Sequence, residues 1–112
     1  MTRPEELAQQ QLDAYNKQDL DAFVSVYSED VVVRDFPSNQ VTLSGIEQFR
    51  ERYANLFQAN PNQHAELKSR TVKGNIVIDH EYVTGRANGE AVEAIAIYEV
   101  SKDQIINVWF VK

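Results

Sequence analysis

The spacing of apolar residues predicts three helices in the first half of the chain. A first helix begins at Thr2, which is placed to cap it, and ends before the polar segment 16–18. Asp19 is placed to cap a short second helix. Residues 44–47, Ser-Gly-Ile-Glu, have the pattern of a capping box and begin a third helix, which Asn-Pro-Asn at 60–62 stops. All three helices carry one apolar face, so each is expected to pack against a common core.

Strand patterns dominate the second half. Residues 31–36, VVVRDF, predict one strand between the second and third helices. Four more are predicted after residue 63, with short turns rich in Gly, Asn and Asp between them, at 64–73, 76–86, 91–101 and 104–111. This order of elements predicts a single α+β domain over residues 1–112, with the three helices packed on one face of a curved, mostly antiparallel sheet.

Composition narrows the possible functions. The 112 residues suit one compact domain, and the net charge of −6 argues against binding to nucleic acid or to an anionic membrane surface. The absence of cysteine excludes disulfides and thiol catalysis. No apolar run is long enough to span a membrane, and no signal peptide is evident, so we expect a cytoplasmic protein.

Three segments resemble the NTF2-like superfamily, which includes SnoaL-like proteins and ketosteroid isomerases. They are AYNKQDLDAFVSVYSEDVVVRD at 14–35, LSGIEQFRERYANLF at 43–57 and AIAIYEVSKDQIINVWF at 94–110. The resemblance covers nearly the whole chain. It implies a cone-shaped pocket between helices and sheet for a small hydrophobic molecule, and commonly a homodimer. It also implies acid–base chemistry that needs no cofactor.

Residues of the predicted strands 76–86 and 91–101 decide what would face such a pocket. A three-residue loop at 87–89 pairs His80 with Ala96 and places His80 and Tyr82 inward, opposite the small Ala94 and Ala96. A two-residue turn at 88–89 would instead place Glu81 inward. We expect the first register. Asp79, Glu81, Ile95 and Ile97 would then lie on the outer face, which would suit a homodimer contact or remain an ordinary exposed sheet face.

Two ionisable side chains are the predicted catalytic pair. Asp35 ends the apolar strand 31–36, where desolvation could make it a base, and the resemblance implies the same role. His80, if it faces inward, could donate or relay a proton. The structural alternatives are that Asp35 begins a turn and that His80 is an ordinary core histidine. His64 is expected to face solvent, and no spacing of His and carboxylates predicts a metal site.

The sequence departs from the ketosteroid isomerases at both oxyanion-stabilising positions. Aligning the segment NKQDLD puts Gln11 where the resemblance implies a tyrosine, and the final hairpin puts Ala96 where it implies a carboxylic acid. Gln11 could still donate one hydrogen bond, whereas the side chain of Ala96 cannot. A standard ketosteroid isomerase is therefore not expected.

Aromatic residues supply the remaining candidate ligand contacts. Besides Gln11, the predicted substrate-binding residues are Tyr15, Tyr53, Tyr82, Tyr98 and Trp109, the last placed inward by a two-residue turn at 102–103. The same side chains could instead pack as core. Two functions follow from these alternatives. The first is a cofactor-independent isomerase or cyclase acting on a small apolar molecule, and the second is a non-catalytic ligand-binding or dimerisation module.

Overall fold

The computed structural model describes all residues from 1 to 112 and has three helices and six strands. The helices are α1 (Arg3–Lys17), α2 (Leu20–Ser25) and α3 (Ile46–Ala59). The strands are β1 (Tyr27–Phe36), β2 (Val41–Ser44), β3 (His64–Lys73), β4 (Ile76–Thr84), β5 (Val92–Ser101) and β6 (Gln104–Val111). The predicted elements are all present, and the short strand β2 was not predicted.

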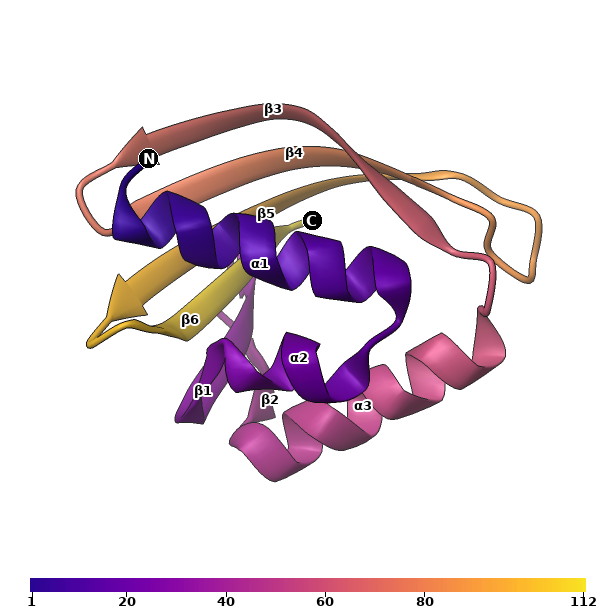
Figure 1. Cartoon of the computed structure of the whole chain (residues 1–112), viewed down its shortest axis with the longest axis horizontal. Coiled ribbons are helices and arrows are strands. Elements are labelled where there is room, and N and C mark those ends of the chain that lie inside the picture. The colour runs from indigo at the N-terminus through magenta and orange to yellow at the C-terminus, as the bar shows by residue number, and fades with distance from the viewer.

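The six strands form one curved sheet in the order β2-β1-β6-β5-β4-β3. All neighbours are antiparallel except β1 and β6, which are parallel. The long strands β3 to β5 arch over α1, while α2 and α3 lie below it (Figure 1). This is the predicted α+β architecture, with three helices covering one face of a mostly antiparallel sheet. No helix has the length and apolar character needed to cross a membrane.

The residues that precede the helices determine where each helix begins. Thr2 and Asp19 cap α1 and α2 as predicted, each accepting a hydrogen bond from a backbone N–H three residues on. The capping box predicted for α3 is wrong. Gly45 is its N-cap and makes no side-chain bond, and the Gln48 side chain accepts the Ser44 N–H instead.

Asn16 shows why the polar segment 16–18 stands at the end of α1. Its amide donates to the backbone carbonyl of Ala65 at 3.0 Å and accepts from the Ala65 N–H at 2.8 Å. These two bonds satisfy the edge strand β3, which would otherwise expose unpaired backbone groups to α1. Gln18, in a left-handed conformation, donates to the Asn60 carbonyl at 2.6 Å. The side chains of Asn16 and Gln18 therefore connect the end of α1 to the sheet and to the end of α3.

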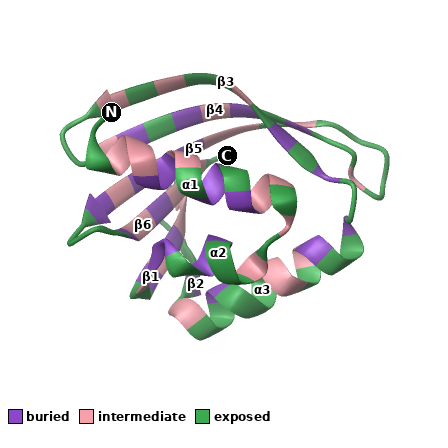
Figure 2. Cartoon of the chain, in the orientation of Figure 1, coloured by how far each residue is buried: buried purple, intermediate pink, exposed green.

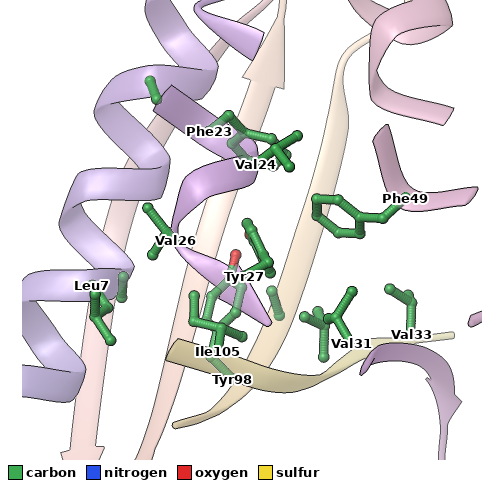
Figure 3. Close-up of a cluster of buried hydrophobic side chains, with 14 of the residues drawn as sticks. Leu7, Phe23, Val24, Val26, Tyr27, Val31, Val33, Phe49, Tyr98 and Ile105 are labelled. Atoms are coloured by element: carbon green, nitrogen blue, oxygen red, sulfur yellow. The ribbon is translucent and has the colours of Figure 1, made fainter. Parts of the chain in front are cut away.

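The core lies between the helices and the concave face of the sheet. Figure 3 shows the rings of Phe23, Tyr27 and Phe49, from α2, β1 and α3, gathered near Tyr98 and Ile105 of the sheet. The Tyr27 and Phe49 ring centroids are 4.3 Å apart. Offset aromatic contacts of this kind stabilise by about 0.5–1.5 kcal/mol each beyond their burial.

Candidate functional site

A cavity of about 370 Å³ opens between the aromatic cluster and the inner face of the sheet. Most of its lining is apolar, and its polar groups are few. Its volume falls at the lower end of the range of roughly 300–1,000 Å³ that is usual for small-molecule sites. Its polar lining residues include Gln11, Tyr15, Tyr53, Glu81, Arg86 and Tyr98.

Glu81 is the buried carboxyl group among the residues that line the cavity. Its residue is only 8% exposed, and no group of the chain donates a hydrogen bond to its carboxylate. Burial raises the pKa of Glu81 from 4.5 to about 7, the neighbouring Asp79 charge adds to the rise, and the Arg70 guanidinium opposes it. A carboxyl group with such a pKa can both accept and donate a proton near neutral pH.

Asp79 lies two residues before Glu81 on the same face of β4 and is fully buried. Arg70 of β3 binds it through two parallel hydrogen bonds, Nε to Oδ1 at 2.7 Å and an Nη to Oδ2 at 3.0 Å. The other Nη of Arg70 donates to the Gln9 side chain at 2.9 Å. The Asp79 carboxylate is thus neutralised by a fixed partner, while that of Glu81 is not, and this difference separates a structural carboxylate from a chemically available one.

Several tyrosines line the cavity together with Glu81. Burial, and then the charge of Glu81, raise the pKa of Tyr98 well above its usual value, and burial followed by Glu81 raises that of Tyr15 to about 12. These hydroxyls therefore keep their protons at neutral pH. Tyr27 donates to the Gln11 side-chain oxygen at 3.0 Å, and Gln63 donates to the Tyr15 hydroxyl at 2.5 Å. The hydroxyls of Tyr53 and Tyr98 have no partner within the chain and remain available to a bound molecule.

Of the predicted ligand-binding residues, Gln11, Tyr15, Tyr53 and Tyr98 line the cavity. The Gln11 amide is not free, because its Nε2 donates to the Ala8 carbonyl at 3.0 Å while its oxygen accepts from Tyr27. Gln11 therefore supports Tyr27 and offers no hydrogen bond of its own to the cavity.

The predicted inward position of His80 is wrong. In the structure β4 and β5 pair His80 with Ile95 and Glu81 with Ala94, one residue away from the expected register. The odd-numbered residues of β4 are buried and the even-numbered ones face outward, as the alternation along β4 in Figure 2 shows. His80 lies on the outer face, 3.1 Å from Glu93. Tyr82 is there as well, 40% exposed, and its predicted inward position is also wrong.

A longer loop than expected causes this difference. Neither the three-residue loop nor the two-residue turn forms, because the last pair is Val83 with Val92 and the chain between β4 and β5 runs from residue 85 to 91. The outcome for β4 is nevertheless that of the alternative register, with Glu81 inward. On β5 the predicted inward residues were correct, and Ala96 lies opposite Asp79, where its small side chain leaves room for the Arg70 ion pair.

Trp109 also faces outward, contrary to the prediction. The two-residue turn at 102–103 forms as expected and pairs Ser101 with Gln104. The register then shifts between Val100 and Glu99, so that Ile106 is an extra residue and Trp109 pairs with Ile97. This bulge turns Trp109 to the outer face, where its indole N–H donates to Asn39 at 2.9 Å.

Asp35 does not line the cavity. It lies near the end of β1, half-buried, where its backbone N–H donates to the Gln40 carbonyl at 2.9 Å and its carbonyl accepts from Asn39 at 2.8 Å. The structure therefore places Asp35 at a turn and brings it together with neither His80 nor Glu81. His64 is exposed, as predicted.

Comparison with known proteins identifies the family. A model of the SnoaL-like domain matches residues 8–108. The chain belongs to the SnoaL-like domain family. A cystatin-fold protein of Novosphingobium aromaticivorans is 30% identical to this SnoaL-like domain, with a TM-score of 0.88 over 100% of this chain and 99% of the other.

More distant structures share the fold of this SnoaL-like domain. An NTF2-like protein of Cytophaga hutchinsonii is 16% identical, with a TM-score of 0.79 over 96% of this chain and 87% of the other. A candidate SnoaL-like polyketide cyclase of Jannaschia sp. CCS1 is 21% identical, with a TM-score of 0.77 over 96% and 83%. Among curated proteins no sequence matches this SnoaL-like domain significantly.

Proposed function

We propose that this SnoaL-like domain binds a small, largely apolar molecule in its cavity and moves a proton on it with Glu81. The single observation that carries the proposal is a buried carboxylate on the cavity wall that has no hydrogen-bond partner and a pKa of about 7. The reaction class is isomerisation or cyclisation of a carbonyl compound without a cofactor. The distant likeness to a candidate polyketide cyclase is consistent with this class.

The proposed step removes a proton from a carbon next to a carbonyl group. The Glu81 carboxylate takes the proton, and the C–H electron pair forms the enolate, whose charge rests on the carbonyl oxygen. The free hydroxyls of Tyr53 and Tyr98 are the available donors to that oxygen. Isomerisation is completed when Glu81 returns the proton to another carbon. Cyclisation is completed when the carbanion forms a C–C bond to a second carbonyl carbon of the same molecule, and the alkoxide left by the broken C=O π bond takes the proton back from Glu81.

The base activity can be tested with 5-nitrobenzisoxazole, a flat neutral compound. Removal of its ring proton breaks the N–O bond and releases a coloured nitrophenolate. We expect the rate to rise with pH through about 7, as Glu81 ionises, and to fall at least about tenfold in Glu81→Gln. Glu90→Gln, which changes an exposed loop residue, is the matched control and should keep the full rate.

An unchanged rate in Glu81→Gln would remove Glu81 from the mechanism. Binding of the probe with no turnover above the buffer rate in the wild-type protein would favour the alternative function, a non-catalytic binding module. Two observations support that alternative. Ala96 provides no carboxylic acid at the position where the resemblance to ketosteroid isomerases implies one, and the Gln11 amide is already occupied by hydrogen bonds within the chain.

The homodimer through the outer sheet face remains a proposal, with a corrected set of residues. Ile97 pairs with Ile78 on one side and Trp109 on the other, so these apolar side chains lie together at the centre of that face. Ile78 is 37% exposed. We expect a dimer in sedimentation at micromolar concentration and a monomer for Ile97→Lys. Gln58→Lys, on the exposed side of α3, should leave the dimer intact, and a wild-type monomer would contradict the proposal.

A further inference from the structure

Arg86 is a cation in the cavity that the proposed proton transfer does not use. Its side chain lines the cavity, and its Nε is buried without any hydrogen-bond partner. No carboxylate of the chain forms an ion pair with it, although acidic residues outnumber basic ones by 17 to 11. A buried guanidinium N–H normally has a partner, because leaving it unpaired costs the full desolvation of that group. The Nε N–H of Arg86 is therefore free to donate a hydrogen bond to a molecule in the cavity.

The backbone around Arg86 is fixed by contacts to the end of α3. The Ala87 N–H donates to the Asn60 side chain at 3.0 Å, and the Gly89 N–H donates to the Arg86 carbonyl at 2.9 Å. Gly85 has a φ of +75° and approaches the Asn62 carbonyl so closely that a Cβ would lie 2.1 Å from its oxygen. A glycine is required there on both counts. These contacts present Arg86 at a defined place on the cavity wall.

Arg86 and Glu81 both line the cavity and are not paired with each other. The charge of Glu81 raises the pKa of Tyr15, and that of Arg86 lowers it, so Tyr15 is within electrostatic reach of both. The charges that shift the pKa of Glu81 are those of Asp79 and Arg70, and Arg86 is not among them. Arg86 thus does not neutralise Glu81, and the proton of the Tyr15 hydroxyl is free to be donated, since Tyr15 accepts its other hydrogen bond from Gln63.

We infer that the molecule bound in the cavity carries a carboxylate, which Arg86 anchors with help from the Tyr15 hydroxyl, on an otherwise apolar body that reaches Glu81. The inference deepens the proposed function by naming the substrate class as small aromatic or alicyclic keto acids. The planar guanidinium matches a carboxylate with two parallel hydrogen bonds. The aromatic rings lining the cavity match the apolar body.

The test compares 2-naphthoate with 2-naphthamide, two probes of nearly equal shape that differ in charge. Binding to the full chain is measured by calorimetry at pH 6, where Glu81 is largely protonated and the naphthoate is ionised. We expect naphthoate to bind at least about tenfold more tightly than naphthamide. Arg86→Gln should abolish this preference, and Arg86→Lys should retain part of it. Arg50→Gln, an equal change of charge on the exposed side of α3, should leave it unchanged.

Equal affinity of the two probes for the wild-type protein would overturn the inference, as would a preference that survives in Arg86→Gln. Thermal unfolding of each variant checks that the fold is kept, and Arg86→Lys gives a second reading if Arg86→Gln is destabilised. The outcome is independent of the 5-nitrobenzisoxazole assay, because that probe is neutral and reports on Glu81. Failure of one test therefore leaves the other interpretable.

Discussion

Replacing Asp79 with asparagine is expected to lower the free energy of unfolding by about 3 to 5 kcal/mol. Asp79 is fully buried, and its two oxygens accept hydrogen bonds from Arg70, whose side chain is 10% exposed. Asparagine cannot balance the guanidinium charge, which would stay largely buried without a counter-charge. Urea denaturation at neutral pH measures the loss, with Glu90→Gln as a control that should cost less than about 0.5 kcal/mol.

A double variant separates the ion pair from the loss of a single side chain. Arg70→Met combined with Asp79→Leu removes both charges, so it should be less destabilising than Asp79→Asn alone. If the double variant instead loses more free energy of unfolding than Arg70→Met and Asp79→Leu lose in sum, the unpaired charge is not the cause of the destabilisation in Asp79→Asn. Asp79→Asn should also lower the pKa of Glu81, because the repelling charge is gone while Arg70 remains.

Replacing Glu81 with glutamine is expected to stabilise the protein by about 3 kcal/mol at pH 8 and to change its stability little near pH 4. The pKa of Glu81 rises from 4.5 to about 7 on folding, and each pKa unit corresponds to about 1.4 kcal/mol. The folded state therefore holds this proton more tightly than the unfolded state. The favourable contribution is complete below pH 4.5 and is lost as the pH rises to about 7.

The measurement is the free energy of unfolding of both proteins across that pH range. The difference between Glu81→Gln and wild type should grow between pH 4.5 and 7 and then stay constant. If the difference in free energy of unfolding does not depend on pH, the substitution changes stability through packing alone and not through the charge of Glu81. A side chain that costs stability at neutral pH is expected where function, and not folding, requires the charge.

Local signals in the sequence predicted the elements well. Thr2, Asp19 and the Asn-Pro-Asn segment at 60–62 mark helix ends that depend only on neighbouring residues. The strand boundaries in the second half are correct to within two residues for the same reason. The four-residue strand β2 was missed because Val41–Ser44 is too short to establish a periodic pattern.

The inward group of β4 could not be read from local pattern. Its even-numbered residues include Ile76, Ile78 and Tyr82, and these apolar side chains lie on the outer face, so hydrophobicity does not separate the two faces. The loop at 85–91 is held by Asn60 and Asn62, which are distant in sequence. The bulge at Ile106 likewise cannot be predicted from the sequence of the neighbouring turn at 102–103.

One signal in the sequence groups the charged residues of β3 and β4 correctly. A two-residue turn at Gly74-Asn75 pairs Lys73 with Ile76 and, continued along the strands, Arg70 with Asp79. Oppositely charged residues directly across a sheet are favourable partners. This pairing places Asp79 on the face of Arg70, and Glu81, two residues on, on the same face, but it does not determine whether that face is the inner one.

The central claim is that Glu81, and not His80 or Asp35, is the proton-transfer group of this cavity. Titration of the Glu81 side-chain carboxyl carbon by ¹³C NMR tests it most directly, assigned by its loss in Glu81→Gln. We predict a midpoint near pH 7, which falls in Asp79→Asn. A midpoint near 4.5 in the wild-type protein would mean that Glu81 is solvated like any surface carboxylate, and it would contradict the account.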